Sequence, residues 1–246
     1  MNDKAITVGP GFDFAFCPVL DEMIQTRLIT GRSGKRFHPG ALSTSNNLHM
    51  LRHLQLSLKP ARTLEVGLCF GSSCLLFTAT HREMGRQAGR QHMALDPYQK
   101  EAWDDSGLLA IERAGLSEYL DFRPQLSSVV LPRLLENGEQ FDLIYVDGSH
   151  LFEDVFIDAY YTSRLLSEGG VVAFDDCRDA HVAKVMQFIR RNHSDALEEL
   201  DLSPFRADQG KSVKYRVARL MGKTQMRAFR RVGTLSRPYN APLHNF

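Results

Sequence analysis

Cysteine is scarce in this chain, and its distribution disfavours two classes of protein. The four cysteines are Cys17, Cys69, Cys74 and Cys177, and no two of them form a Cys-x-x-Cys pair. No group of histidine and cysteine residues has the spacing of a zinc site. Small buried thiols in a reducing cytosol are therefore expected, and neither a disulfide scaffold nor a zinc module is favoured.

Long hydrophobic runs are also missing from the sequence. No apolar stretch approaches the ~20 residues that a membrane-spanning helix requires. The start of the chain, Met1 to Lys4, lacks a basic region followed by an apolar stretch, so we expect no signal peptide. These absences favour a cytoplasmic protein without a transmembrane segment.

Acidic residues are absent from the last part of the chain. Residues 211–246 hold nine Lys or Arg and no Asp or Glu, while the whole chain has a formal net charge of +1. The remainder is therefore acidic. A basic end can contact an anionic membrane surface, a nucleic acid or an acidic glycan. A solvated tail, or an arm packed on a neighbouring subunit, is the favoured alternative.

The motif that organises the chain runs Thr-Leu-Glu-Val-Gly-Leu-Cys-Phe-Gly-Ser-Ser from Thr63 to Ser73. It predicts a short apolar strand, a turn on two glycines, and a helix over residues 72–82. A glycine turn lets the backbone approach a ligand closely, and the helix offers unpaired N–H groups at its first turn. This geometry is typical of a nucleotide site at the carboxyl edge of a parallel sheet. The Glu-x-Gly-x-x-x-Gly spacing differs from the dinucleotide pattern, which disfavours a dehydrogenase.

Strands and helices alternate over most of the 246 residues, a length sufficient for one α/β domain with a full core. The expected strands cover residues 63–66, 92–95, 119–123, 141–146, 171–174, 197–202 and 212–220. The expected helices cover residues 47–58, 72–82, 103–115, 128–136, 153–166 and 180–192. This alternation predicts an α/β fold with a doubly wound, mostly parallel sheet.

Acidic side chains follow three of the expected strands. Asp96 ends the second strand, where a carboxylate can accept hydrogen bonds from both hydroxyls of a ribose, although Asp-Pro also forms plain turns. Asp147 ends a buried strand, and Asp175 and Asp176 end the next one. Neighbouring carboxylates repel one another, and a divalent cation bound through oxygen would offset that repulsion. Alternatively, Asp147 and Asp176 cap the helices that follow them.

Together these segments resemble the class I S-adenosylmethionine-dependent methyltransferases. The resemblance rests on the glycine motif, Asp96, the Asp-Gly-Ser-His segment from Asp147, and the Gly-Gly to Asp-Asp segment that ends at Asp176. It is nearest to the cation-dependent O-methyltransferases of small molecules and sugars. It implies a Rossmann-like sheet of seven strands, the last antiparallel. It also implies a cap or lid over residues 1–60, a cofactor-binding domain over 61–222 and a basic tail over 223–246.

The resemblance implies specific roles for residues of this chain. S-adenosyl-L-methionine is the expected cofactor, bound by Glu65, Gly67, Gly71, Ser72, Ser73, Asp96, Ser127 and Asp147. A divalent cation, Mg²⁺ being favoured, is expected on Asp147, Asp175 and Asp176. Asp176 stands where catechol-type enzymes have Asn, which leaves the identity of the metal open. His150 occupies the position of a catalytic lysine in that family, and a histidine, with an ordinary pKa near about 6.5, suits a general base. His150 could instead cap or orient the following helix.

The expected function is methyl transfer to a hydroxyl group of a small molecule or sugar. A nucleic-acid methyltransferase that uses the basic tail is an alternative, but no Asn-Pro-Pro-Tyr-type motif is present. A non-catalytic cofactor-binding module is another, and the intact acids and His150 disfavour it. The resemblance makes a homodimer plausible. The acceptor itself stays open, because loops and the cap shape its pocket.

Overall fold

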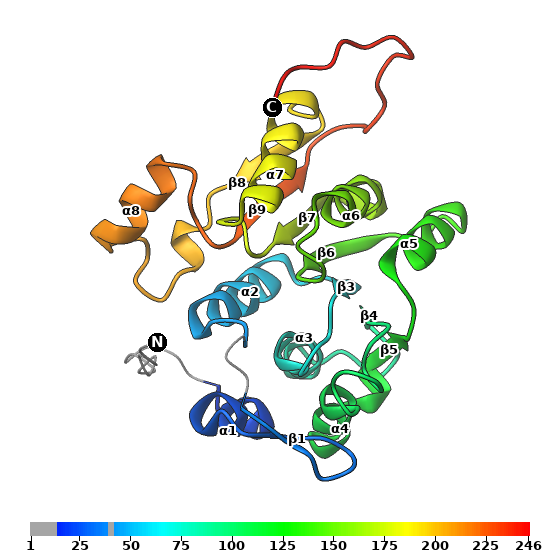
Figure 1. Ribbon diagram of the computed structural model, residues 1–246, viewed down its shortest axis with the longest axis vertical. Coiled ribbons are helices and arrows are strands. Elements are labelled where there is room, and N and C mark those ends of the chain that lie inside the picture. Colours follow the sequence, from blue (N-terminus) through cyan, green and yellow to red (C-terminus); the bar gives the residue numbers. More distant parts are fainter. Residues whose placement is uncertain (1–13, 39–41) are drawn as a thin grey trace.

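The fold is a three-layer α/β arrangement around one central sheet (Figure 1). A computed structural model describes residues 14–38 and 42–246, so part of the expected cap, residues 1–13 and 39–41, lies outside the described residues. The strands are β1 Ile29–Thr30, β2 Arg36–Phe37, β3 Thr63–Val66, β4 His92–Leu95, β5 Leu120–Arg123, β6 Phe141–Val146, β7 Leu166–Phe174, β8 Leu197–Leu200 and β9 Arg227–Arg231. The helices are α1 Pro18–Thr26, α2 Ser45–Leu58, α3 Ser72–Glu83, α4 Ser106–Arg113, α5 Ser127–Glu136, α6 Phe152–Leu165, α7 Ala180–Asn192 and α8 Val213–Leu220, with short 3-10 turns at Ser117–Tyr119 and Ser203–Phe205.

The central sheet has seven strands in the order β5-β4-β3-β6-β7-β9-β8. The first five strands in this order run parallel, and β9 pairs antiparallel with both β7 and β8. Strand order reverses between β3 and β6, and open α/β sheets bind ligands at the carboxyl ends of such strands. The doubly wound sheet with an antiparallel last strand, expected from the sequence, is confirmed.

Helices cover both faces of the sheet, so its inner strands are apolar on both sides. Leu143 and Tyr145 of β6 face the core formed with α1, α2 and α3, while Ile144 and Val146 face the core formed with α5, α6 and α7. Neighbouring strand residues point to opposite faces, so alternate positions of one apolar run fill two separate cores. Figure 1 shows α5, α6 and α7 grouped on one side of the strands and α1 to α4 on the other.

The last part of the sheet differs from the sequence prediction. Residues 212–220 were expected to form a strand, but α8 occupies Val213–Leu220, with the Ser212 hydroxyl accepting a hydrogen bond from the backbone of Tyr215 at its N-cap. The last strand is instead β9, which lies within the segment expected to be an irregular basic tail. Val213, Tyr215 and Val217 alternate as in a strand, but Val213 and Val217 are also four residues apart, as on one face of a helix, so the pattern fits both elements. The sheet therefore extends beyond the expected boundary at residue 222.

The strand β9 was not predicted because its arginines made the segment resemble a solvated basic tail. Arg227 is buried, and its Nε donates to Glu199 of β8 at 2.7 Å. Arg231 donates to the backbone carbonyl of Leu166. Cationic side chains that pair inside the sheet cannot be distinguished from a solvated basic tail by composition alone.

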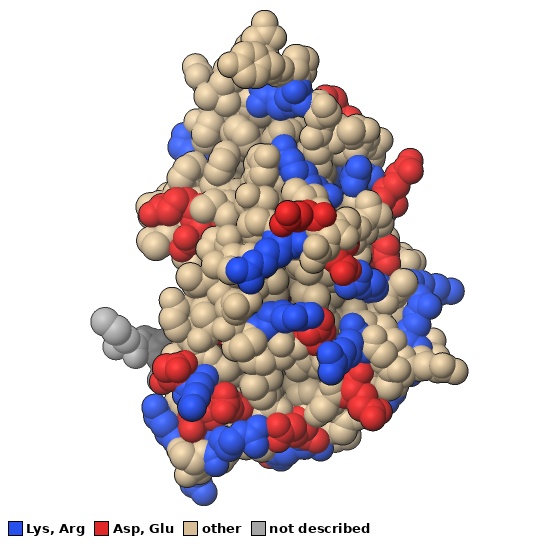
Figure 2. Space-filling model, turned by 90° about the vertical axis from the view of Figure 1, so that its right-hand side faces the viewer, with Lys and Arg blue, Asp and Glu red and all other residues tan. Residues whose placement is uncertain are grey.

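The surface carries charges of both signs. Figure 2 shows one face on which basic and acidic side chains intermingle, without a broad area of a single sign. Arg113, for example, pairs with Glu22 at 2.9 Å, and Arg32 pairs with Glu112 at 2.6 Å. Within residues 14–38 and 42–246, no helix has both the length and the apolar character to cross a membrane.

Candidate active site

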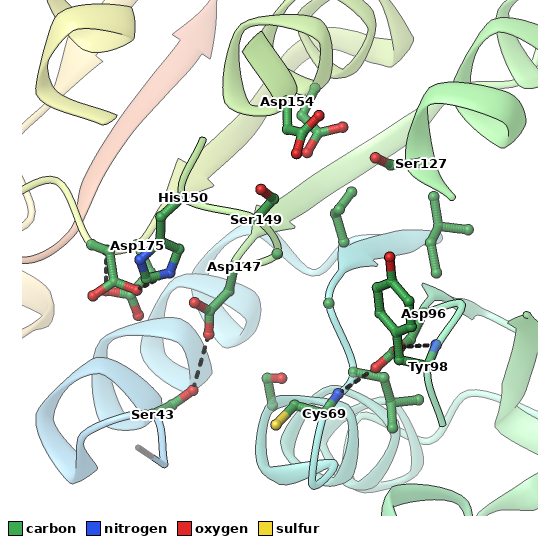
Figure 3. Close-up of a pocket in the computed structure, with 18 of the residues that line it drawn as sticks. Ser43, Cys69, Asp96, Tyr98, Ser127, Asp147, Ser149, His150, Asp154 and Asp175 are labelled. Carbon is green, nitrogen blue, oxygen red and sulfur yellow. Dashed lines mark hydrogen bonds and ion pairs between the residues drawn. The ribbon is translucent and has the colours of Figure 1, made fainter. Parts of the chain in front are cut away.

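A cavity of about 720 Å³ opens at the carboxyl ends of the parallel strands. It is lined by residues 66–70 at the end of β3, 95–98 at the end of β4, 126–128 at the start of α5 and 147–151 after β6. The cavity is also lined by the start of α2, two acids of α6, Asp175 and Asp176 after β7, Ser72, Ser73, Trp103 and Gln225. Figure 3 shows Asp96 on one side of this cavity and Asp147, His150 and Asp175 grouped on another.

The two glycines of the motif serve contacts between chain segments. Gly67 has φ +93°, and a Cβ placed there would lie 2.2 Å from the backbone oxygen of Asp147. Gly71 has φ +83°, and its Cβ would lie 3.0 Å from the Cα of Gly107. Gly67 lines the cavity, whereas Gly71 does not. Because glycine has no Cβ, the turn after β3 can approach the end of β6, and the start of α3 can approach α4.

Asp96 fastens the glycine turn to the end of β4. Its Oδ2 accepts hydrogen bonds from the backbone N–H of Cys69 at 2.7 Å and from Gln99 Nε2 at 2.9 Å. Its Oδ1 accepts one bond, from the backbone N–H of Tyr98 at 2.8 Å. Because a carboxylate oxygen has two lone pairs, Oδ1 can accept a further hydroxyl from the cavity.

Glu65 is placed away from the cavity. Its side chain is fully buried and is not part of the cavity lining, and its Oε1 lies 3.3 Å from His92 Nε2. Alternation along β3 turns Val66 toward one core and Glu65 toward α3. Glu65 therefore does not reach the cavity in this structure, and the cofactor contact that the resemblance implies for it stays a prediction. Ser72 and Ser73 at the start of α3 do line the cavity.

Acids of α6 line the cavity near Ser127, and sequence reasoning missed them. Asp158 is 2% exposed, and burial raises its pKa to about 7, an effect that a hydrogen bond from Ser127 partly opposes. Asp154 lies one helical turn earlier on the same face. Two acids spaced four apart on a helix that follows a strand-end aspartate could have indicated this wall.

Asp175 is held by protein donors. Asn47 Nδ2 lies 2.9 Å from its Oδ1 and 2.8 Å from its Oδ2, and the Tyr145 hydroxyl lies 2.5 Å from Oδ2. The same hydroxyl lies 3.1 Å from Asp147 Oδ2. Burial raises the pKa of both Asp147 and Asp175, and the neighbouring carboxylates raise the pKa of Asp147 further.

The group of candidate metal ligands that lines the cavity contains only two of the three expected acids. Ligand atoms of Asp147, His150 and Asp176 lie within 4.8 Å of one another. Asp175 lies outside this group because Asn47 and Tyr145 engage it. Tyr145 could have been anticipated, since it stands two residues before Asp147 and so shares its side of the strand. Asn47 could not, because it comes from a distant helix.

His150 bridges two carboxylates. Its Nε2 lies 2.9 Å from Asp176 Oδ2, and its Nδ1 lies 3.0 Å from Asp179 Oδ2. A neutral imidazole has one donating and one accepting nitrogen, so the tautomer decides which of the two acids accepts a hydrogen bond from the ring. Asp179 precedes α7 and was not anticipated. With Asp179 holding Nδ1, Nε2 is the nitrogen that would accept a proton once it is released from Asp176, as in a general base oriented by a carboxylate.

Comparisons with known sequences agree with the methyltransferase resemblance. Residues 64–177 match a family model described as a methyltransferase domain. A protein of Arabidopsis thaliana, described as a probable caffeoyl-CoA O-methyltransferase, is 31% identical over 144 residues, which cover 56% of this chain and 58% of that protein. Caffeoyl-CoA O-methyltransferase 1 of Eucalyptus globulus is 28% identical over 163 residues, covering 63% of this chain and 59% of its own length. The chain therefore spans under two thirds of the length of these relatives.

Solved structures share the whole fold. An O-methyltransferase from Bacillus cereus, crystallised with S-adenosylhomocysteine, aligns with a TM-score of 0.60 and 18% identity over 88% of this chain and 91% of its own. The O-methyltransferase TomG from Streptomyces achromogenes, crystallised with S-adenosylmethionine, aligns with a TM-score of 0.59 and 16% identity over 90% of this chain and 91% of its own.

The sheet order and the cavity at the strand reversal define a Rossmann-like nucleotide-binding fold. Within this class, residues 64–177 match a methyltransferase domain, and the relatives and solved structures described above are O-methyltransferases. These similarities agree with the family expected from the sequence.

Proposed function

We propose that this protein transfers a methyl group from S-adenosylmethionine to a hydroxyl oxygen of a small molecule or sugar, with a divalent cation beside the acceptor. One observation carries the proposal. A single cavity joins the Asp96 end, suited to a nucleoside, to the group formed by Asp147, His150 and Asp176. The sequence relatives named caffeoyl-CoA O-methyltransferases support a hydroxyl acceptor.

The charge of the cavity suits this cofactor. Among the described residues its lining contains no Lys or Arg but contains the carboxylates of Asp96, Asp147, Asp154, Asp158, Asp175 and Asp176. S-adenosylmethionine carries a positive sulfonium and an ammonium group, which an acidic cavity attracts. The neutral thioether product loses the sulfonium charge, so the same field favours release after transfer.

His150 is the residue we assign to proton removal. In the transfer, an acceptor oxygen forms a bond to the methyl carbon while the carbon–sulfur bond breaks, and that electron pair stays on sulfur. The hydroxyl proton passes to Nε2 of His150, whose ring Asp179 holds through Nδ1. This role requires Nε2 to leave Asp176, which it contacts at 2.9 Å. Holding oxygen, methyl and sulfur in line is the remaining task of the cavity.

Asp147 and Asp176 are the cation ligands that we propose. Mg²⁺ prefers oxygen donors, which favours these two carboxylates over the imidazole of His150. The carboxylates of Asp175 and Asp176 lie close enough to Asp147 to raise its pKa by like-charge repulsion. A bound cation would offset this repulsion. A bound divalent cation would lower the pKa of the acceptor hydroxyl as a Lewis acid. Asp175, also expected as a ligand, instead anchors α2 through Asn47 in this structure.

Calorimetric titration with S-adenosylhomocysteine tests the cofactor. We expect binding in EDTA, with NADH giving no heat. A separate titration with Mg²⁺ should give a heat that disappears in Asp176→Ala. Absence of S-adenosylhomocysteine binding would overturn the proposed function, whereas absence of a Mg²⁺ heat would remove only the cation.

A methyl-transfer screen tests the reaction. Hydroxyl compounds, including catechols and sugars, are incubated with methyl-labelled cofactor, with Mg²⁺ or with EDTA. We expect label in an ether product, and a rate that falls in EDTA. Label on RNA and not on any hydroxyl compound would support the nucleic-acid alternative.

A further inference from the structure

A second cavity, of about 260 Å³, lies beside the first and is basic where the first is acidic. Among the described residues its lining includes no Asp or Glu, and it includes the cationic side chains of Arg178, Arg206 and Lys214. Its walls come from α2, the loop after β7, α8 and the segment that leads into β9. A cationic cavity of this kind favours a phosphate or carboxylate group.

Shared residues join the two cavities. Thr44, Asn47 and Gln225 line both of them. Gln225 Nε2 donates to Asp176 Oδ1 at 2.5 Å. The basic cavity therefore begins one side chain away from the carboxylate that we place beside the acceptor hydroxyl.

The three cations differ in how far their charge is already neutralised. Lys214 makes no hydrogen bond or ion pair with any described residue. Arg178 donates only through Nε, to a backbone carbonyl at 3.2 Å, which leaves its terminal nitrogens for another partner. Arg206 pairs with Asp208 at 2.8 Å and lies over the ring of Tyr215 at 3.9 Å, so it is held in place and partly neutralised. Lys214 and Arg178 thus carry the uncompensated charge.

We propose that this basic cavity binds a phosphate or carboxylate group carried by the methyl acceptor. The inference rests on the proposed function and assigns the acceptor to the anionic hydroxyl compounds. The opposite charges of the two cavities then determine which cavity binds the cofactor and which binds the anionic group of the acceptor. The cationic cofactor is attracted to one cavity and the anionic group of the acceptor to the other, while the reversed arrangement brings like charges together.

Calorimetric titration of the full chain with inorganic pyrophosphate, and separately with citrate, tests this site. EDTA is present, so that neither anion binds through a metal. We expect Lys214→Ala and Arg178→Ala each to weaken binding about tenfold, the equivalent of one lost charged hydrogen bond. Arg216→Ala is the matched control, since Arg216 is exposed on the same helix and lines neither cavity. Tighter binding of pyrophosphate indicates a phosphate on the acceptor, and tighter binding of citrate a carboxylate.

Titration of the same proteins with S-adenosylhomocysteine separates this inference from the proposed function. Wild type and Lys214→Ala should bind it equally. If it binds while both anions bind more weakly than about 10 mM, the anion site is wrong and the methyl-transfer proposal stands. Equal losses in Lys214→Ala and Arg216→Ala would also overturn the site. If S-adenosylhomocysteine does not bind wild type, the assignment of the anion to a methyl acceptor falls together with the proposed function.

Discussion

His150 is positioned by contacts that no local pattern specifies. Asp179 holds its Nδ1 at 3.0 Å, and Asp176 contacts its Nε2 at 2.9 Å. About half of the side chain is exposed to solvent in the cavity mouth. Such a residue can be removed without leaving a buried void, so a substitution reports on chemistry more than on folding.

Replacement of His150 tests its assignment as the base. We expect His150→Ala to lower kcat at least about tenfold, since general-base catalysis typically contributes ~10²–10⁴-fold, and to leave S-adenosylhomocysteine affinity unchanged. The assay is the initial rate on an acceptor found in the screen. His181→Ala, an exposed histidine on α7, is the control. Equal rates for His150→Ala and wild type would remove His150 from the mechanism.

Asp158 makes stability depend on pH in the absence of cofactor. Burial raises its pKa from the ordinary 3.8 to about 7, so between these values the folded protein holds a proton that the unfolded chain has released. Folding stability therefore falls as pH rises through this window. Asp158→Asn cannot ionise, and we expect it to be more stable than wild type at pH 8, by on the order of a few kcal/mol, with a smaller difference at pH 5.

Urea unfolding at the two pH values measures this effect. Glu153→Gln, an exposed carboxylate on the same helix, is the control and should leave the pH dependence unchanged. The same dependence in wild type and Asp158→Asn would show that another group is responsible.

The turn between β3 and α3 is the element on which the cavity depends. Its conformation needs a positive φ at Gly67, and its close approach to the end of β6 leaves no room for a side chain. Asp96 then ties the turn to β4 through the backbone of Cys69. The glycine motif, which is typical of ligand-binding turns, is thus also required for packing the ends of β3, β4 and β6 together.

Gly67→Ala is expected to destabilise the protein by at least about 2 kcal/mol, because it combines backbone strain with a contact to a backbone oxygen that cannot move freely. Gly85→Ala provides the comparison, since Gly85 also has a positive φ, of +71°, but has nothing within 4 Å of its added Cβ. Gly85→Ala should lower the free energy of unfolding only through backbone strain. Equal urea midpoints for the two variants would contradict the packing explanation.

At the scale of the whole molecule, β9 completes the sheet. It pairs with β7 over four positions on one side and with β8 over four on the other, and Phe229 at its centre is fully buried. The residues after it return to α7, where Phe246 contacts Phe188 with ring centres 5.1 Å apart. The basic end of the chain is therefore partly structural.

Truncation distinguishes the structural part from the remainder. A chain ended after Gly222 lacks β9, and we expect it to lose cooperative thermal unfolding because β7 and β8 lose their shared neighbour. A chain ended after Gly233 keeps β9 and should unfold cooperatively at a lower Tm than the full chain. Circular dichroism during heating measures both. Cooperative unfolding of the shorter chain would place the domain boundary near residue 222, where the sequence had suggested it.

Sequence and structure agree best where the determining pattern is local. The strands at Thr63–Val66, His92–Leu95 and Phe141–Val146 were predicted with their observed bounds, since each is a short apolar run closed by glycine or an acid. The prediction of a strand over residues 212–220 was wrong, because a short basic segment with valines fits both the strand and the helix period. Glu65 lies off the cavity since a strand turns alternate residues away from each other.

The sequence by itself determined the fold class, the resemblance to methyltransferases and the positions of the acids at the sheet edge. These depend on alternating elements and on motifs a few residues long. Tertiary structure decided which side chains meet there. Asn47 engages Asp175 across 128 positions of sequence, and Asp179 reaches His150 across 29. Such pairs depend on how whole helices pack on the sheet, and packing is a property of the complete core and of no single segment.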